Sequence, residues 1–276
     1  MSEPFSIVQD GPIARLTFTR PERANALGAA FWQTFPGAID ALDRAGQTRV
    51  LVIEAEGRHF CSGMDTDAFT ALGGSDTAHD RLRFRSNLLV LQEALTRLEQ
   101  TDFAVVVAIQ GACLGGGLDL ALACDIRVCS ENASFGIEES NIAIVADLGS
   151  LQRGVHALPY GVMADLALTG RRMPAAEAAR YGLVASVEAS DEACRARALE
   201  IANSIASKSP LMVAGIKRSL QNARDAAIAD GLKFIANWNA GMFAPAEVGE
   251  ALVARAEKRA AEFAPLVTPP ATGPTD

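Results

Sequence analysis

The sequence predicts an α/β protein in which short strands alternate with amphipathic helices. Three observations support this prediction. Residues 14–20 alternate between apolar and polar side chains, which is typical of a half-buried strand. Residues 49–57 and 103–111 contain short apolar runs rich in β-branched residues, as buried strands do. Residues 81–100 place apolar side chains at helical spacing.

The remaining elements follow in chain order. Residues 21–45 predict a loop and an amphipathic helix, and the small-residue turn CSGMD comes soon after residues 49–57. The strand at 103–111 leads into LGGGLDLALACD, which predicts a turn running straight into a helix. Residues 126–136 predict two short strands, and the Ala-rich chain from about residue 164 predicts helices.

The chain of 276 residues is long enough for one large core with an appendage. We expect the core to span residues 1–195, because strand patterns end near residue 190. A helical C-terminal region is expected over residues 196–265, as an appendage or an oligomerisation element. The Pro-rich, polar residues 266–276 predict a disordered tail.

Composition excludes several classes of protein. The net charge of −8 makes nucleic acid an unfavourable partner, and no run of eighteen uncharged apolar residues predicts a membrane span. The five cysteines form no C-x-x-C pair, and the N-terminus lacks the basic and apolar regions of a secretory signal. These observations favour a reducing compartment, and we expect a cytoplasmic protein.

Two glycine-containing segments are candidates for binding a negative charge. In GACLGGGLDLALACD, three glycines between a buried strand and a helix expose backbone N–H groups that can hold an anion or a developing oxyanion. HFCSGMD could supply a second N–H donor. The alternative for each segment is an ordinary tight turn. Neither is a Walker A loop or a G-x-G-x-x-G dinucleotide motif.

Metal and hydrolase chemistry find little support. The three histidines, His59, His79 and His156, lack metal-ligand spacing, and the cysteines lack zinc spacing. No G-x-S-x-G motif indicates a serine hydrolase. We therefore expect no metal site and a structural role for His59.

Three carboxylates are the remaining candidates for chemistry. Asp119 could instead complement its helix dipole, Glu139 could be a solvated loop charge, and Asp147 could cap the helix that follows it. Together the three would suit proton removal at one carbon and proton delivery at another.

The motifs RPERANAL, HFCSGMD and GACLGGGLDLALACDIRV occur in this order along the chain. In this the sequence resembles the enoyl-CoA hydratase/isomerase (crotonase) superfamily over nearly its whole length. The resemblance implies a spiral of ββα units, a C-terminal helical trimerisation region, and a homotrimer or a dimer of trimers. It also implies an acyl-CoA substrate whose thioester oxygen lies between the N–H groups of Met64 and Gly116, with no metal or redox cofactor.

Within the superfamily, FGIEESNIAIVADLGSLQRG resembles the Δ3,5-Δ2,4-dienoyl-CoA isomerases, as does the later NWNAGMF. Those isomerases carry Asp, Glu and Asp at the positions of Asp119, Glu139 and Asp147, whereas hydratases have Glu at the first and Gly at the last. Asn141 departs from the pattern, since the isomerases tend to carry Asp there. The implied roles are proton removal from C2 by Glu139, proton delivery at C6 by Asp147, and polarisation of this pair by Asp119.

The resemblance also implies contacts with coenzyme A, which enters as part of the substrate. It places Arg23, Ala24, Cys61 and Gly63 near the CoA entrance. Lys258 matches a family lysine, which implies a contact with CoA from its own or a neighbouring subunit, and its alternative is a surface helix charge.

Other functions stay open. An enoyl-CoA hydratase would use Asp119 and Glu139 to position water and would leave Asp147 as a helix cap. Another crotonase reaction, such as a Δ3,Δ2-enoyl-CoA isomerisation or a hydrolysis, is a second alternative. From a different class, the chain could be a non-catalytic relative that binds acyl-CoA or RNA, although three intact carboxylates and the negative charge argue against this.

Overall fold

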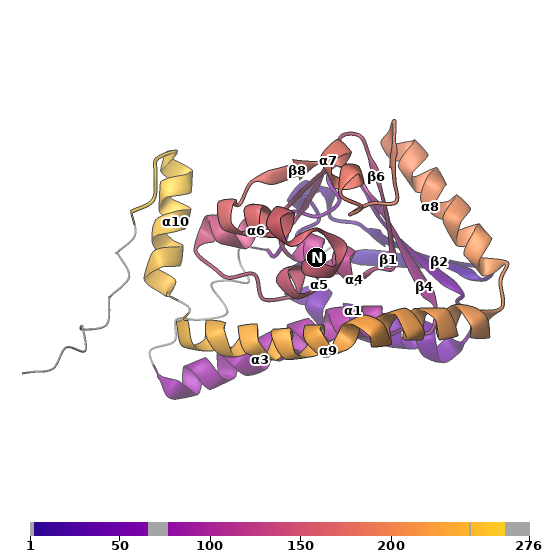
Figure 1. The fold of residues 1–276 in the computed structure, drawn as a ribbon, viewed down its shortest axis with the longest axis horizontal. Helices are drawn as coiled ribbons and strands as arrows, with labels where there is room; N and C mark the ends of the chain where they lie inside the picture. Colours follow the sequence, from indigo (N-terminus) through magenta and orange to yellow (C-terminus); the bar gives the residue numbers. More distant parts are fainter. Residues whose placement is uncertain (1–2, 66–76, 243, 263–276) are drawn as a thin grey trace, which may run out of the picture.

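Two β-sheets organise the protein, whose computed structural model describes residues 3–65, 77–242 and 244–262 (Figure 1). The larger sheet has six strands, in the order β1 (Phe5–Asp10), β2 (Ile13–Phe18), β3 (Val50–Ala55), β4 (Ala104–Ile109), β6 (Ile126–Ser130) and β9 (Ser186–Glu188). β1 is antiparallel to β2, and every later neighbour in the sheet is parallel. The smaller sheet joins β5 (Ala112–Leu114), β7 (Ser134–Gly136) and β8 (Arg172–Pro174).

Helices follow the strands in turn and give the expected α/β architecture. In chain order they are η1 (Pro21–Arg23), α1 (Ala29–Ala45), α3 (Ala78–Glu99), α4 (Gly116–Ala123), η2 (Glu138–Ile142), α5 (Ser150–Ala157), α6 (Tyr160–Thr169), α7 (Ala175–Arg180), α8 (Asp191–Ala206), α9 (Pro210–Met242) and α10 (Pro245–Glu257). Pairs of strands that precede a helix, such as β1–β2–α1 and β4–β5–α4, are the ββα units of the predicted spiral.

The strands missed by the sequence reasoning are short or lie at an edge. β1 forms a hairpin with β2 through the two-residue turn at residues 11–12, Gly-Pro, and Gly11 has φ +54°. Glycine with a positive φ at the first position of a two-residue turn is a hairpin signal, so this strand was predictable. β5, β8 and β9 have three residues each, too few to show a periodicity.

The buried strands serve two cores. On β3, Val50 and Val52 face one core and Leu51 and Ile53 face the other. This follows from the alternation of side chains along a strand. The smaller core is covered by α8, which presents Cys194, Ala198, Ala202 and Ala206 at intervals of four residues. Small side chains at this spacing let the helix lie close to the sheet.

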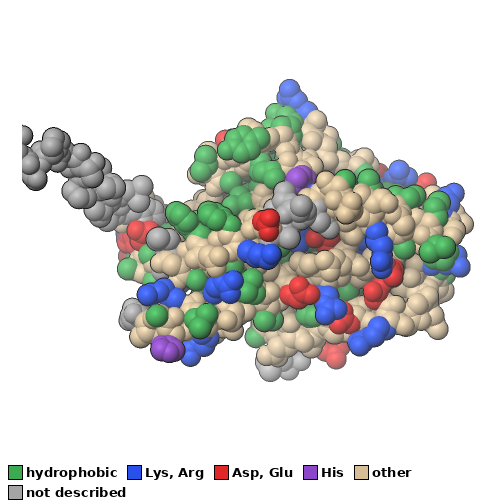
Figure 2. All heavy atoms as spheres, turned by 60° about the horizontal axis from the view of Figure 1, so that its bottom comes forward, with side chains coloured by type: hydrophobic (Ala, Val, Ile, Leu, Met, Phe, Trp, Pro, Cys, Tyr) green, Lys and Arg blue, Asp and Glu red, His purple; other side chains and the backbone are tan. Residues whose placement is uncertain are grey.

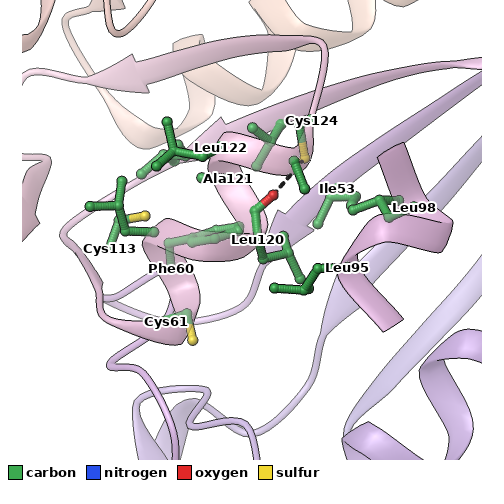
Figure 3. Packing of buried hydrophobic residues seen from close by; sticks show 14 of the residues in the cluster. Ile53, Phe60, Cys61, Leu95, Leu98, Cys113, Leu120, Ala121, Leu122 and Cys124 are labelled. Atoms are coloured by element: carbon green, nitrogen blue, oxygen red, sulfur yellow. Dashed lines mark hydrogen bonds between the residues drawn. The ribbon is translucent and has the colours of Figure 1, made fainter. Parts of the chain in front are cut away.

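The larger core lies beneath α4. Leu120 of α4 packs among Phe60, Leu95 and Leu98, and its carbonyl accepts a weak hydrogen bond from the Cys124 thiol at 3.3 Å (Figure 3). All five cysteines are free and buried. This packing anchors the helix whose N-terminus carries the glycine-rich turn.

The C-terminal helices lie along one side and one end of the molecule. α9 packs along α3, whereas α10 contacts η2 at the end opposite α8 (Figure 1). The expected division at residue 195 falls inside α8, so the division into 1–195 and 196–265 stays a prediction. Residues 266–276 lie outside the described residues.

Basic and acidic side chains are interspersed with apolar ones over the face shown in Figure 2. Of the helices that the structure describes, none combines the length and the apolar character needed to cross a bilayer.

Candidate active site

A cavity of about 720 Å³ opens between η1, the turn after β3, the β5–α4 turn, η2 and α10. Its lining includes Ala24, Met64, Gly115, Glu139, Ile142 and Leu252. A volume of this size suits a small-molecule ligand. One candidate N–H donor, Met64, and one candidate carboxylate, Glu139, therefore share one cavity, and the lining residue Gly115 directly precedes the second candidate donor, Gly116.

Met64 offers its backbone N–H to this cavity. The segment after β3 pairs with Leu27, whose N–H donates to the Gly63 carbonyl at 2.8 Å. The Leu27 carbonyl in turn accepts from the Asp65 N–H at 3.1 Å. Because successive N–H groups of extended chain point to opposite sides, the Met64 N–H points away from Leu27. Pairing with Leu27 thus frees this donor.

Gly116 supplies the second donor. It is the first residue of α4, so its N–H has no acceptor within the helix and lies at the positive end of the helix dipole. The turn before it needs glycine, since Gly115 has φ +46°. A Cβ atom placed on Gly116 would lie 3.6 Å from the Met64 nitrogen, and one placed on Gly63 would lie 3.7 Å from the Gly116 nitrogen. The two donors are therefore neighbours, as an oxyanion site requires.

Glu139 lies directly beside these donors. Its Oε1 atom is 2.8 Å from the position of a Cβ atom on Gly115, and its Oε2 atom is buried without a hydrogen-bond partner among the described residues. Burial raises the pKa of Glu139 well above its ordinary value, and the charges of Asp119 and Asp147 raise it further. This carboxyl binds a proton more tightly than a solvated glutamate does.

Asp119 is fully buried one turn further along α4. Its Oδ1 atom accepts hydrogen bonds from the Ser150 N–H at 2.5 Å and from the Ser150 hydroxyl at 2.6 Å. Burial raises its pKa to about 6, although the Ser150 hydrogen bonds and the charge of Arg153 act in the opposite direction. Its Oδ2 atom is buried and has no partner in the described structure.

Asp147 completes the cluster and does not cap the following helix. That helix, α5, begins at Ser150, and its first N–H is held by Asp119. The Asp147 Oδ2 atom instead accepts a hydrogen bond from the Asn239 amide at 2.6 Å. Burial raises the pKa of Asp147 to about 7; the Asn239 bond lowers it and the Asp119 charge raises it. The structure therefore contradicts the helix-cap alternative.

The predicted CoA contacts divide into two groups. Arg23, Ala24 and Gly63 line the cavity. Cys61 is fully buried beneath it, where its sulfur accepts a hydrogen bond from the Gly63 N–H at 3.4 Å and burial raises its pKa to about 12. Lys258 is exposed at the C-terminal end of α10 and is not among the lining residues.

His59 lines the same cavity in a position that fits a structural role. Its Nδ1 atom accepts a hydrogen bond from the Ala112 N–H at 3.1 Å. Burial lowers its pKa, and the charges of Arg58 and Arg172 lower it further. The ring is thus held neutral and joins the turn after β3 to strand β5.

Sequence reasoning missed three polar residues of the site: Ser150, Asn239 and Gln92. Asn239 lies in the NWNAGMF segment, so the resemblance of that segment was a usable signal. Ser150 directly follows the ADLG segment, but its hydroxyl meets Asp119 only in the folded chain. Gln92 occupies an inward position of an amphipathic helix, where a buried amide calls for a partner.

The arrangement defines a class of chemistry. Two neighbouring backbone N–H groups can stabilise an oxyanion, and the three carboxyl groups beside them, one fully buried and two partly buried, retain at least one proton near neutral pH. Such a site can remove and return protons at carbons conjugated to a carbonyl group. Within the described residues, no group of three or more His, Cys, Asp or Glu side chains is arranged to hold a metal ion.

Comparison with known proteins gives the family. The model of the enoyl-CoA hydratase/isomerase family matches residues 9–265, and the chain belongs to this family. A crystal structure of an enoyl-CoA hydratase/isomerase from Pseudoalteromonas atlantica T6c has a TM-score of 0.82 and 28% identity, covering 95% of this chain and 100% of that one. The predicted crotonase-type fold is confirmed.

Two curated relatives extend the comparison. The chain is 39% identical to the peroxisomal Δ3,5-Δ2,4-dienoyl-CoA isomerase of Arabidopsis thaliana, over 93% of this chain and 94% of the relative. It is 33% identical to the mitochondrial Δ3,5-Δ2,4-dienoyl-CoA isomerase of Mus musculus, over 90% of this chain and 77% of the relative. These relatives contradict the expected cytoplasmic location, since both are named for organelles. Free, buried thiols fit a reducing compartment in general and do not select the cytoplasm.

Proposed function

We propose that this protein is a Δ3,5-Δ2,4-dienoyl-CoA isomerase. The observation that carries the proposal is the third carboxyl group, Asp147, which Asn239 holds beside Asp119 and Glu139 instead of at a helix terminus. Moving a proton over a short distance on the substrate needs one acid–base group. Moving two double bonds needs proton removal at one carbon and proton delivery at a separated carbon, and so calls for a second group. The dienoyl-CoA isomerases among the relatives support the same activity.

In the first step, Glu139 in its ionised form takes a proton from C2 of a 3,5-dienoyl-CoA. C2 adjoins the thioester carbon, so the carboxyl nearest the oxyanion donors is the one placed to reach it. The N–H groups of Met64 and Gly116 stabilise the dienolate oxygen, and one such donor contributes about 3 kcal/mol. The raised pKa of Glu139 makes it a stronger base than a solvated carboxylate.

In the second step, Asp147 in its protonated form delivers its proton to C6. The electrons of the dienolate shift, the double bonds at C3 and C5 become double bonds at C2 and C4, and the thioester carbonyl re-forms. Glu139 now holds a proton and Asp147 is ionised, so a proton exchange between the two groups restores the starting state. Asp119 lies close enough for its charge to raise the pKa of both carboxyl groups.

The substrate contacts and the assembly belong to the same proposal. Arg23, Ala24 and Gly63 line the cavity and would contact the CoA portion, with no metal or redox cofactor taking part. A homotrimer or a dimer of trimers is proposed, supported by exposed apolar side chains such as Phe234 and Trp238 on α9. In such an assembly the exposed Lys258 could reach the CoA of a neighbouring subunit, and sedimentation velocity measures the subunit number.

An ultraviolet assay tests the activity. Purified protein is given 3,5-octadienoyl-CoA and, separately, a 2-enoyl-CoA. Growth of conjugated dienoyl-thioester absorbance supports the isomerase. Loss of the 2-enoyl absorbance alone would instead make the protein a hydratase.

The variant Asp147→Asn tests the acid role. We expect it to isomerise at least about 100-fold more slowly, because it removes the proton donor while keeping the size of the side chain. Asp230→Asn, which removes an exposed carboxylate from α9, is the matched control. Unchanged isomerisation in Asp147→Asn would refute the acid role.

A further inference from the structure

Asn239 is a buried amide of α9 whose orientation is determined by its partners. Its Nδ2 atom lies 2.9 Å from the Val145 carbonyl oxygen and 2.6 Å from the Asp147 Oδ2 atom. A carbonyl oxygen can only accept a hydrogen bond, so the NH₂ group of the amide, and not its oxygen, must face Val145. The same NH₂ group then donates its second hydrogen to Asp147.

This geometry assigns the two oxygens of Asp147 to different tasks. Both hydrogens of the Asn239 amide are in use, and the amide nitrogen cannot accept a proton. Oδ2 of Asp147 therefore accepts from Asn239, and an acid proton on Asp147 must sit on Oδ1. No other side chain is recorded as a donor to Asp147 in the described structure; the further bond to its carboxyl comes from its own backbone N–H, so no side chain occupies Oδ1.

The backbone of Asp147 is held from a second helix. Gln92 of α3 donates from Nε2 to the Asp147 carbonyl at 2.6 Å and to the Leu232 carbonyl at 3.3 Å. Gln92 is buried like Asn239. Amides from α3 and α9 thus hold the backbone and the side chain of one residue, although neither amide lines the cavity.

We propose that Asn239 is a positioning residue that directs proton delivery by Asp147, by holding Oδ2 so that Oδ1 presents the proton to the substrate. The inference rests on the proposed isomerase function. When Oδ1 gives up its proton, Asp147 becomes a carboxylate, and the hydrogen bond from Asn239 becomes charge-assisted and stronger. Asn239 therefore stabilises the product of the proton transfer more than the starting acid.

The surroundings of Asp147 set the sign of the effect. Five groups face Asp147 or the backbone beside it. Gln92 of α3 and Asn239 of α9 are neutral amides, and Asp119 of α4 and Glu139 of η2 are carboxyl groups. The fifth is the guanidinium of Arg153 of α5, which donates to the carbonyl of the residue after Asp147. Asn239 is the only one of these recorded to bond the Asp147 carboxyl, and its bond lowers the pKa. Removing it makes Asp147 a weaker acid that keeps its proton to higher pH.

Asn239→Leu tests the inference, because leucine has a similar size and no donor. We expect kcat to fall roughly 10- to 100-fold with little change in KM, the effect of losing one hydrogen bond to a charged group. Activity requires protonated Asp147, so kcat declines as the pH rises through the pKa of this group. In the variant this decline should move to higher pH, whereas a purely structural defect would leave its position unchanged.

A second variant and a partial reaction complete the test. Asn239→Asp keeps the shape of the side chain but places a carboxylate beside Asp147, so it should also move the decline to higher pH; it carries the test if the leucine variant does not fold. Exchange of the C2 protons of a saturated acyl-CoA in D₂O, followed by mass spectrometry, requires Glu139 and the two N–H donors but not proton delivery by Asp147. This exchange should keep the wild-type rate in the folded variants.

Asn237→Leu is the matched control, since Asn237 lies two residues away on the exposed side of α9 and contacts Arg85. The inference is overturned if the wild type isomerises its substrate but the Asn239 variants keep the wild-type position of the pH decline. Absence of dienoyl isomerisation in the wild type would instead overturn the proposed function.

Discussion

Replacing Asp119 with asparagine should stabilise the protein in a pH-dependent way. The carboxyl group is fully buried, and its hydrogen bonds to Ser150 only partly offset the loss of hydration. Asparagine keeps an oxygen that can accept the same two hydrogen bonds and carries no charge at any pH. The native aspartate should therefore cost stability wherever it must be ionised.

The magnitude follows from the pKa. Burial raises the pKa of Asp119 from 3.8 to about 6, so the folded state binds this proton more tightly than the unfolded chain does. The corresponding stability is complete below about pH 3.8 and is lost as the pH rises through about 6. At about 1.4 kcal/mol per pKa unit, the full difference is about 3 kcal/mol. Roughly 1.4 kcal/mol of it is lost between about pH 5.0 and pH 7.5.

Urea unfolding at these two pH values measures the effect. The free energy of unfolding of Asp119→Asn, relative to the wild type, should rise by about 1.4 kcal/mol from the lower to the higher pH. Asp230→Asn, which removes an exposed carboxylate, should show no such rise. A difference between Asp119→Asn and wild type that is equal at both pH values would refute a raised pKa for Asp119.

Two further predictions concern the packing around the cluster. Gly115→Ala should lower kcat by roughly 100-fold in the ultraviolet assay. The alanine Cβ atom would lie 2.8 Å from Glu139 Oε1, and Gly115 has φ +46°, which alanine rarely adopts. Gly161→Ala is the control and should keep full activity, because a Cβ atom at Gly161 would meet open space. Arg153→Met should lower the free energy of unfolding in urea by about 3 kcal/mol, because it removes a guanidinium that donates to the buried Glu99 at 3.0 Å and 3.2 Å; a loss below about 1 kcal/mol would show that Glu99 is satisfied without it.

Local sequence was enough to predict the class of fold and most of the long elements. Alternation along 14–20 and the apolar runs at 49–57 and 103–111 are strong signals because each strand buries one face or both. The same reasoning missed the three-residue strands β5, β8 and β9, whose pairing depends on partners far along the chain. It also suggested helix-cap duty for Asp147, a role that depends on where α5 begins.

The sequence by itself determined which residue types the site has available. The sequence alone shows the glycines at 115 and 116, the carboxylates Asp119, Glu139 and Asp147, and the apolar segment between the last two.

Only the tertiary structure decided what these groups do to one another. Asp119, Ser150 and Asn239 come from three different helices, and the hydrogen bonds among them and Asp147 exist only after α4, α5 and α9 have packed. Burial raises the pKa of a carboxyl group because it removes water from around the group. The neighbouring residues in the sequence do not show how much water is removed. Which carboxyl groups of the site are protonated near neutral pH is therefore a property of the folded chain. The sequence names the residues, but only folding brings them together.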